Sequence, residues 1–380
     1  AELVGIDWQQ SDHLIRFLKD NHVDLVVVGP EAPLVAGLAD VLNKAGIPVF
    51  GPSKAAAQLE GSKVFAKDVM KKYNIPTAAY GVFHNVDEAK EFIAQTGAPI
   101  VVKADGLAAG KGVVVAMTIE EANAAVEDML RGNRFGDAGS TVVIEEFMEG
   151  EEASLLAFVD GKTVVPMIAS QDHKRIYDGD KGPNTGGMGT YAPAPVLTDA
   201  LRDEAIKTIL EPMVAAMEKE GMPYVGCLYA GLMITPQGPK VVEFNARFGD
   251  PETQVVLPLL DSDLGQIMMA CATGTLTANM VKWKDSSAAC VILASKGYPE
   301  TSSKGDMIHG DIKQHDTTIV FHSGTKLIGD EYVTNGGRVL GIVGLGKDLR
   351  TALDRAYGRI EHIDFEGMQY RTDIGAKAFK

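Results

Sequence analysis

The chain has 380 residues, 46% of them apolar and 23% charged, which is typical of a globular protein with two or more domains. Its 36 basic and 51 acidic residues give a formal charge of −15, which argues against a nucleic-acid partner and confines any phosphate site to a local basic pocket. Three scattered cysteines and the lack of a bilayer-length apolar run argue against a disulfide framework, a zinc site and a membrane partner, so we expect a cytoplasmic protein with buried thiols.

The first sixty residues alternate between helical and strand-like segments. We expect helices at 12–22 and 34–45 and a short strand at 47–50. The run Asp-Leu-Val-Val-Val-Gly at 24–29 has an apolar centre, as is typical of a central strand in a parallel sheet. This order predicts the middle of a doubly wound α/β domain, which the sequence enters partway through.

The rest of the chain mixes helices with antiparallel strands. Helices are expected at 63–73, 86–95, 119–130, 199–220, 262–273 and 349–360. Strands are expected at 100–103, 113–116, 141–146, 228–235 and 240–244, with a hairpin over 153–169 and a strand-rich region from about 288. The polar, glycine-rich segment 171–189 is too long for a plain connection, so we interpret it as a functional loop.

A glycine-rich segment at 105–112 superficially resembles a Walker phosphate loop. Its glycines are one residue too close, and Gly112 stands where that loop has a metal-binding Ser or Thr. Both flanks are predicted strands, whereas a Walker loop joins a strand to a helix. A glycine-rich hairpin can instead fold its backbone N–H groups over a polyphosphate, with Lys103 and Lys111 supplying positive charge. The alternative is a flexible hairpin tip that binds nothing.

Two further segments carry acidic or mixed polar side chains. The strand at 142–148 is followed by Glu151 and Glu152, which can accept hydrogen bonds from an adenine amino group and ribose hydroxyls, although taken alone a solvated acidic rim explains them better. The charged segment 170–175, with the glycine-rich 184–189, can close over a ligand. Its His173 can act as a base, but a single loop histidine more often donates a hydrogen bond, and a disordered surface loop is the alternative.

The most informative segment lies at 241–254. Strand alternation places Glu243, Asn245 and Arg247 on one face, with Phe244 and Ala246 on the other. A carboxylate and a carboxamide oxygen suit Mg²⁺, which takes few protein ligands and completes its shell with phosphate oxygens. An adjacent arginine can clamp a transferring phosphoryl group. The alternative is the solvent-facing side of an antiparallel hairpin.

In this order the motifs resemble the ATP-grasp superfamily, and more narrowly the glycinamide ribonucleotide synthetases. The shared motifs lie at 29–34, 58–63, 103–112, 171–175, 182–189, 247–254 and 334–338 and so cover essentially the whole chain. Arg-Phe-Gly-Asp-Pro-Glu-Thr-Gln at 247–254 is the most specific of them. The resemblance implies an α/β and α+β multidomain protein with an ATP-grasp fold. Its units would be a truncated, doubly wound N-terminal domain (1–60), the ATP-grasp domain (61–281, with a lid at about 78–150) and a strand-rich C-terminal domain (282–380).

The same resemblance implies a role for each site residue. ATP phosphates would be held by Lys63 and Lys103 and covered by a loop containing Gly106, Gly110, Lys111 and Gly112. Adenine would contact Glu145 and the backbone of Phe147 and Met148, and the ribose would contact Glu152. Glu243 and Asn245 would bind Mg²⁺ or Mn²⁺, and Arg247 would clamp the γ-phosphate or an acyl phosphate. Substrate contacts would come from Glu31, Asp172, Lys174, Arg175 and Asp250. Of these, Asp172, Lys174 and Arg175 would also have catalytic roles.

The implied reaction joins glycine to 5-phosphoribosylamine with ATP, through glycyl phosphate, in the second step of de novo purine biosynthesis, and a monomer is expected. Two features depart from the family pattern. The strand at 229–234 offers no further acidic metal ligand, and the family's first strand and Gly-Gly-Arg-Glu-His loop do not precede residue 1.

Several other functions stay open at this point. One is a different ATP-grasp carboxylate–amine ligase, such as a purine-pathway carboxylase or a formate-using transformylase. Another is an ATP-binding fragment without turnover. A nicotinamide dehydrogenase is disfavoured, because it needs a strand, a glycine loop and a helix where the hairpin at 100–116 stands.

Overall fold

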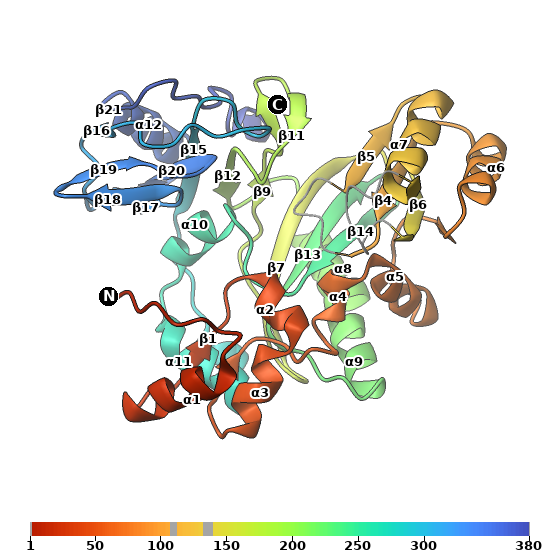
Figure 1. Ribbon diagram of the computed structural model, residues 1–380, viewed down its shortest axis with the longest axis horizontal. Helices are drawn as coiled ribbons and strands as arrows, with labels where there is room; N and C mark the ends of the chain where they lie inside the picture. The colour runs from red at the N-terminus through yellow and green to blue at the C-terminus, as the bar shows by residue number, and fades with distance from the viewer. Residues whose placement is uncertain (1, 107–111, 132–139, 380) are drawn as a thin grey trace.

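The computed structural model describes residues 2–106, 112–131 and 140–379, and its centre is an antiparallel sheet in the order β14-β13-β7-β8 (Figure 1). The strands of this sheet are β7 (Glu151–Asp160), β8 (Val164–Pro166), β13 (Val225–Thr235) and β14 (Gly238–Asn245). The pairs expected at 153–169 and between 228–235 and 240–244 are therefore confirmed. None of the helices in the described ranges is long and apolar enough to cross a membrane.

Helices cover both faces of the central sheet, which explains why β7 is buried along most of its length. Leu155 and its same-face neighbours pack against α8 (Asp199–Ala205), the π-helical turn η2 (Ile206–Leu210) and α9 (Glu211–Lys219). Phe158 on the opposite face packs against α10 (Thr253–Val256) and α11 (Leu264–Thr273), beside the 3₁₀ turns η3 (Leu257–Leu259) and η4 (Ala278–Met280). The three cysteines are free and buried in the core, as expected.

The N-terminal elements form a small α/β unit below the central sheet in Figure 1. They are α1 (Ser11–Asp20), β1 (Val26–Val27), α2 (Glu31–Ala36), α3 (Leu38–Lys44), β2 (Val49–Phe50) and α4 (Gln58–Gly61), with β1 and β2 parallel. Two expectations are wrong here. Val27 is 42% exposed, because in the described residues β1 has one strand neighbour instead of two. The helix expected at 34–45 is broken at Gly37, whose φ of 97° ends α2 and begins α3.

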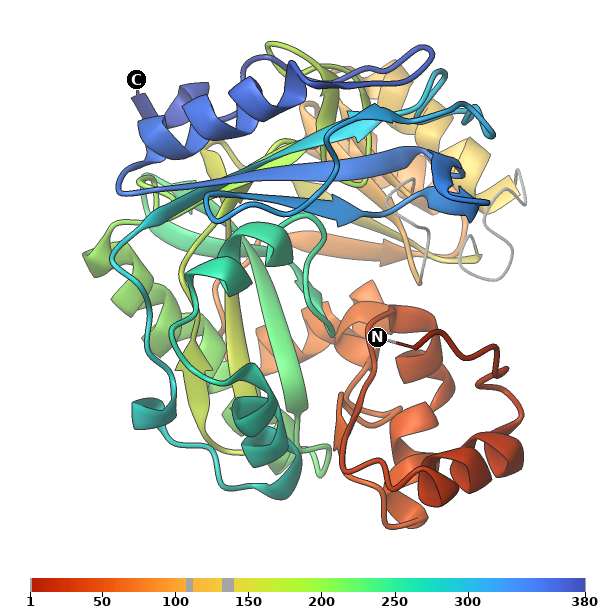
Figure 2. The same cartoon turned by 90° about the vertical axis from the view of Figure 1, so that its left-hand side faces the viewer.

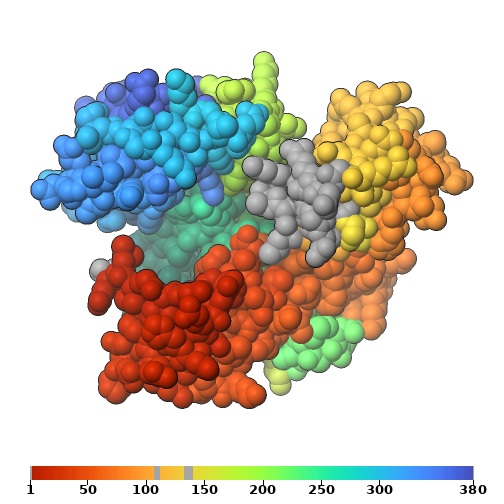
Figure 3. Space-filling model, in the orientation of Figure 1, coloured from red at the N-terminus to blue at the C-terminus, as the bar shows by residue number. Residues whose placement is uncertain are grey.

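A separate four-stranded sheet, which we call the lid sheet, has the order β3-β6-β4-β5 and its own hydrophobic core. It contains β3 (Tyr80–Phe83), β4 (Ile100–Ala104), β5 (Val113–Ala116) and β6 (Val142–Glu146), with α6 (Val86–Thr96) and α7 (Ile119–Arg131) packed on it. Ile100 pairs with Ala116, which confirms the antiparallel hairpin expected around the glycine-rich segment. In the space-filling view these elements form a lobe set apart from the C-terminal strands (Figure 3). Helix α5 (Lys63–Lys72) connects the N-terminal unit to this lobe.

The C-terminal part is built on a five-stranded antiparallel sheet in the order β17-β20-β15-β12-β9. Its strands are β9 (Gln171–Asp172), β12 (Gly189–Ala192), β15 (Ser287–Ala294), β17 (Thr318–His322) and β20 (Arg338–Gly346), and α12 (Leu349–Ile360) lies along one face (Figure 2). The smaller elements are β10 (Arg175–Tyr177), β11 (Lys181–Asn184), β16 (His309–Gly310), β18 (Thr325–Ile328), β19 (Glu331–Thr334), β21 (Ile363–Asp364) and η5 (Ala376–Phe379).

The segment 171–189 is not the loop that its composition suggested. It supplies two strands of the C-terminal sheet and forms the hairpin β10–β11, with Arg175 opposite Asn184. Strand pairing satisfies backbone groups that a loop would have to expose to water. The polar residues at the ends of these short strands are therefore held in place by the sheet.

Candidate active site

A cavity of about 720 Å³ lies where the N-terminal unit, α5, the lid sheet and the central sheet meet, and β20 adds to its wall. Most of the site residues expected from the sequence line it. They are Glu31, Lys63, Lys103, Gly106, Gly112, Glu145, Phe147, Met148, Glu152, Asp172, Lys174, Glu243, Asn245, Arg247 and Asp250. Gly110 and Lys111 lie outside the described residues.

The expected site residue Arg175 does not line the cavity, and neither does His173, the base considered in the same segment. The guanidinium of Arg175 donates to the carbonyl oxygen of Gly182 at 2.7 Å, within the hairpin β10–β11. His173 is buried with its Nδ1 3.3 Å from the carbonyl oxygen of Gly189, and burial lowers its pKa to about 4. Asp172 and Lys174 line the cavity, whereas the side chains of His173 and Arg175 make their contacts elsewhere.

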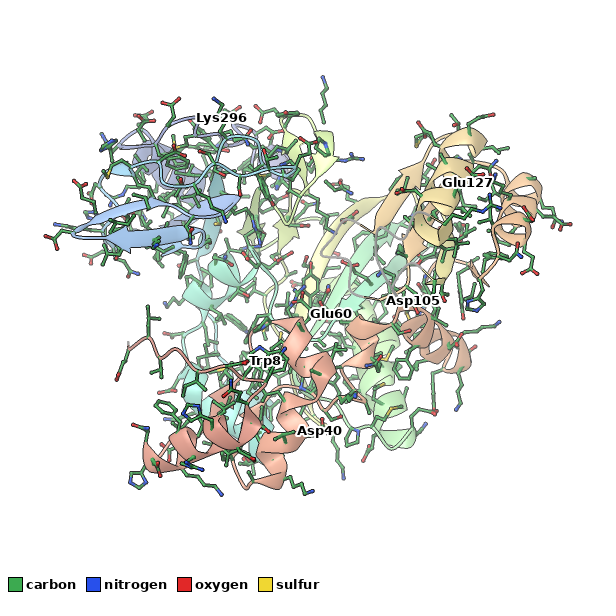
Figure 4. The ribbon with its side chains drawn as sticks, in the orientation of Figure 1. Trp8, Asp40, Glu60, Asp105, Glu127 and Lys296 are labelled. Atoms are coloured by element: carbon green, nitrogen blue, oxygen red, sulfur yellow. The ribbon has the colours of Figure 1, made fainter. Side chains whose placement is uncertain are left out.

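Lys63 is placed by the start of α5. The carboxylate of Asp105, at the end of β4, accepts hydrogen bonds from the backbone N–H groups of Lys63 (2.6 Å) and Val64 (3.2 Å), while Ser62 caps the helix (Figure 4). The ammonium of Lys63 donates to the carbonyl oxygen of Gly106 at 3.0 Å. Burial lowers the pKa of Lys63, although nearby carboxylates oppose this shift. The beginning of the glycine-rich segment is thus attached directly to a lysine of the cavity.

Lys103 belongs to a buried charge cluster that the sequence only partly revealed. Oε2 of Glu145 lies 3.0 Å from Nζ of Lys103 and 3.0 Å from Nζ of Lys67. Lys103 also donates to the carbonyl oxygen of Val242 at 3.0 Å, which connects the lid sheet to β14. Burial lowers the pKa of Lys67 to about 8, although Glu145 counters the effect. Lys67 lines the cavity, and its position four residues after Lys63 on one helix face was the available signal.

Glu243 and Asn245 lie near the end of β14, with Phe244 and Ala246 in the core, so the expected alternation is confirmed. Burial alone would raise the pKa of Glu243. The ammonium groups of Lys174, Lys103 and Lys63 outweigh burial, aided by a hydrogen bond from Asn245, so the pKa is lowered and the carboxylate stays charged. A charged carboxylate beside an amide oxygen, in a cavity bordered by lysines, suits a hard divalent cation that also contacts phosphate. In the described ranges no group of three or more His, Cys, Asp or Glu residues forms a complete metal cage.

Arg247 follows β14 and is held by two carboxylates. Its Nη2 lies 2.9 Å from Oε1 of Glu60, and its Nε lies 3.5 Å from Oε2 of Glu31. The other oxygen of Glu60 accepts the backbone N–H of Ala246 at 2.7 Å, and burial raises the pKa of Glu60 (Figure 4). Glu60 was not singled out from the sequence, although it lies within the shared motif at 58–63.

The opposite wall carries Asp172 and Lys174 from the segment after β8. Nζ of Lys174 lies 2.8 Å from Oε2 of Glu152. Burial raises the pKa of Asp172 to about 7, although Lys174 lowers it in part. Glu252, which the sequence-based reasoning did not select, is buried nearby and accepts a hydrogen bond from the hydroxyl of Tyr229 at 2.8 Å. This wall therefore combines one ammonium with several carboxyl groups.

β20 contributes Arg338 to the cavity. Its Nη2 lies 2.7 Å from Oδ2 of Asp250, and its Nη1 donates to the carbonyl oxygens of Asp250 and Gly186, both at 2.9 Å. Arg338 is the last residue of the shared motif at 334–338, but the sequence did not lead us to assign a role to it. These contacts join the C-terminal sheet to the turn that follows Arg247.

Comparison with known proteins first defines the class. Residues 61–253 match the ATP-grasp (A) domain of phosphoribosylglycinamide synthetase. The biotin carboxylase domain of the Hydrogenobacter thermophilus 2-oxoglutarate carboxylase superposes with a TM-score of 0.76 at 17% identity, over 97% of this chain and 81% of that chain, which shows the fold alone. The predicted ATP-grasp fold class is confirmed.

The remaining matches define the family. Residues 1–60 match the N domain of phosphoribosylglycinamide synthetase and residues 288–377 match its C domain. The chain is 53% identical over 378 residues to the phosphoribosylamine–glycine ligase of Halalkalibacterium halodurans, covering 100% of this chain and 88% of that protein. The crystal structure of the Thermotoga maritima phosphoribosylamine–glycine ligase superposes with a TM-score of 0.78 at 38% identity, over 86% of this chain and 82% of that chain. The chain belongs to the phosphoribosylglycinamide synthetase family.

Proposed function

We propose that the protein uses ATP to join glycine to 5-phosphoribosylamine in de novo purine biosynthesis, giving glycinamide ribonucleotide, ADP and phosphate. One observation carries this proposal. A single cavity gathers the lysines, the oxygen ligands and the arginine that such a reaction needs, in a chain 53% identical over its length to a ligase named for these substrates. The reaction relies on positioning and charge neutralisation and needs no covalent enzyme intermediate.

The lid side of the cavity is the proposed ATP site. Lys63 and Lys103 neutralise the phosphates, and Glu145 accepts a hydrogen bond from the adenine amino group. The backbone of Phe147 and Met148 borders the base, and Glu152 contacts the ribose. Gly106 and Gly112 flank the segment proposed to cover the phosphates, and Gly110 and Lys111 belong to that segment. The buried, lysine-rich surroundings support this assignment, because electrostatic attraction to phosphate strengthens where water is excluded.

Glu243 and Asn245 are the proposed ligands of Mg²⁺ or Mn²⁺. When bound, the cation supplies Lewis-acid neutralisation of the phosphate oxygens. The charged state of Glu243 supports this role, since its lowered pKa keeps the carboxylate ionised at neutral pH.

The chemistry proceeds in two transfers. The glycine carboxylate attacks the γ-phosphorus of ATP and displaces ADP, which gives glycyl phosphate. The amine of phosphoribosylamine then attacks the glycyl carbonyl and displaces phosphate. Arg247 balances charge on the transferring phosphoryl group, and Lys174 stabilises the negative charge that develops on the carbonyl oxygen. Asp172, with a pKa of about 7, is suited to take the proton that the amine loses, and Glu31 and Asp250 contact the substrates.

We also propose that residues 1–60, 61–281 and 282–380 are the functional units, with the lid at about 78–150, and that the protein acts as a monomer in the cytoplasm. Free buried thiols suit a reducing compartment. Light scattering at the assay concentration tests the oligomeric state.

The metal assignment predicts the effect of Glu243→Gln. The amide keeps the shape but removes the charge, so kcat should fall about a hundredfold or more with the fold unchanged. Glu218→Gln on α9, whose side chain is 48% exposed and outside the cavity, is the matched control. Near-native turnover of Glu243→Gln at saturating Mg²⁺ would show that the ligand is another residue.

The substrate assignment is tested by measuring ADP release with paired substrates. ADP release over many turnovers should require both glycine and phosphoribosylamine. Release driven by bicarbonate or by formate would instead identify a carboxylase or a transformylase. ATP binding without release in any mixture would leave nucleotide binding as the function of this chain.

A further inference from the structure

Lys67 belongs to the buried charge cluster around Glu145, and the chemistry proposed above does not use it. Its side chain is 3% exposed, and its Nζ makes two polar contacts, with Oε2 of Glu145 at 3.0 Å and with Oγ1 of Thr77 at 2.8 Å. The hydroxyl of Thr77 in turn donates to the carbonyl oxygen of Val241 at 2.7 Å. The ammonium is therefore fixed between β6 of the lid sheet and β14 of the central sheet.

One carboxylate oxygen of Glu145 has no hydrogen-bond partner in the described part of this cluster. Oε2 of Glu145 is shared by the ammonium groups of Lys67 and Lys103, whereas Oε1 is buried without a hydrogen-bond partner among the described residues. Glu145 lines the cavity and is 3% exposed. A buried acceptor without a donor destabilises a protein, and such groups in native structures often mark a site where a ligand supplies the partner.

We propose that Lys67 is a positioning residue for recognition of the nucleotide base. By holding Oε2 together with Lys103, it presents Oε1 of Glu145 as an acceptor for the 6-amino group of adenine. This inference rests on the proposed ATP site and adds a specificity role for a residue that does not touch the base.

The two-lysine arrangement matters because a single lysine allows another geometry. Without Lys67, both oxygens of Glu145 can turn toward the ammonium of Lys103, which carries three N–H donors. Oε1 would then be satisfied inside the protein and lost to the base. Lys103 would also be drawn toward the carboxylate and away from the phosphates. The charge on Lys67 therefore keeps Oε1 of Glu145 available to the base and keeps Lys103 near the phosphates.

The test compares ATP with purine riboside 5′-triphosphate, which lacks the 6-amino group. Dissociation constants and kcat/KM for both nucleotides would be measured in the unaltered protein and in Lys67→Met, which keeps the length of the side chain and removes its charge. Lys72→Met is the matched control, because Lys72 lies on the same helix but is 62% exposed and pairs with Glu220. Thermal unfolding of each variant checks the fold.

Lys67→Met should reduce the preference for ATP over the analogue by about tenfold or more, with the KM for glycine unchanged. Glu145→Gln should cause a similar loss, and the double variant should add little to either change, because both act on one contact. Lys72→Met should keep the native preference. Thr77→Val, which frees Lys67 without removing charge, should shift the preference in the same direction by a smaller factor and serves if Lys67→Met does not fold.

Equal weakening of both nucleotides in Lys67→Met would overturn the proposal, because it would show that Lys67 only supports the fold. An unchanged preference would overturn it as well. The ATP site itself is tested in the unaltered protein. If that protein binds ATP and the analogue with equal affinity, the proposed adenine contact of Glu145 is wrong. If it binds ATP but forms no glycinamide ribonucleotide, the proposed reaction is wrong, while the comparison of nucleotide binding in Lys67→Met remains valid.

Discussion

Asp172 is held in surroundings that disfavour its charge. Burial is the largest cause of its raised pKa of about 7, Lys174 opposes it, and the nearby carboxyl groups of Glu252 and Glu152 add to it. In an unfolded chain the same group ionises near 3.8. Because the folded pKa is the higher one, folding favours the protonated form, and this contribution is complete below about pH 4 and is lost as the pH rises through 7.

Asp172→Asn should therefore stabilise the protein in alkaline solution. The amide cannot ionise, so Tm at pH 8 should rise by roughly 2 °C or more relative to the unaltered protein, with little gain at pH 4. Turnover should fall if Asp172 takes the amine proton. Asp203→Asn, at a carboxyl group that is 58% exposed, is the control and should change Tm equally at both pH values. A gain for Asp172→Asn that is the same at pH 4 would contradict the assigned ionisation.

At the residue scale, strand alternation was sufficient to predict that Glu243, Asn245 and Arg247 share one face. It could not predict that Lys67 and Glu60 belong to the site. Lys67 contacts Glu145, 78 positions away in the chain, and Glu60 contacts Arg247, 187 positions away. A lysine inside an amphipathic helix ordinarily faces water. The local sequence carries no sign that β6 places a carboxylate opposite it.

At the element scale, the start of α5 is connected to the end of β4. Asp105 accepts two backbone N–H groups of the first helical turn, which both stabilises the helix end and places Lys63 next to Gly106. The carboxylate therefore serves the helix and the phosphate site together.

Asp105→Ala should lower the free energy of unfolding by about 1 kcal/mol, as loss of a helix-capping side chain usually does, and should weaken ATP binding severalfold. Asp348→Ala is a matched control, since Asp348 caps α12 by accepting the N–H of Thr351 at 2.8 Å, far along the chain from the ATP site. Urea unfolding and nucleotide titration measure the two effects. Equal loss of ATP affinity in both variants would mean that Asp105 acts only through overall stability.

Helices and strands whose apolar residues recur at regular spacing were predicted well. Elements that depend on a single residue or on a distant pairing partner were not. The helix at 349–360 matches α12 residue for residue because its apolar positions recur at helical spacing. Gly37 broke a similar pattern by adopting a left-handed conformation that propensity alone does not require. Within the polar segment 171–189, β9 joins a sheet because it pairs with β12, and β12 in turn pairs with β15, about a hundred residues further along the chain.

At the scale of the whole molecule, a buried ion network attaches the last residues to the hairpin β10–β11. Arg371 is 1% exposed, and its guanidinium lies 2.7 Å from Oδ1 of Asp373 and 2.8 Å from Oδ1 of Asp180. It also donates to the carbonyl oxygen of Arg175 at 3.1 Å. The hairpin that follows Lys174 is thus held by a segment almost two hundred residues away in sequence.

Arg371→Leu should lower the free energy of unfolding by about 2–3 kcal/mol, because it removes the guanidinium that Asp373 and Asp180 share and leaves Lys377 as the ion-pair partner of Asp180. The figure is below that for a fully buried pair, since Asp180 is 39% exposed and water compensates part of the loss. Arg202→Leu, which breaks a surface pair with Asp199, should cost less than about 1 kcal/mol. Chemical unfolding of the two variants gives the comparison, and similar losses would show that the network contributes no more than a surface pair.

The C-terminal sheet also limits how the gene can be divided. β12 comes before residue 282 and β15 after it, and the two strands pair from Gly189 with Val291 to Ala192 with Ala288. A recombinant fragment ending at 281 would therefore display the unpaired backbone of β12, an open edge that can recruit strands from other molecules. Such a fragment would aggregate during expression, whereas a split protein with both pieces produced together could reassemble along the same edge.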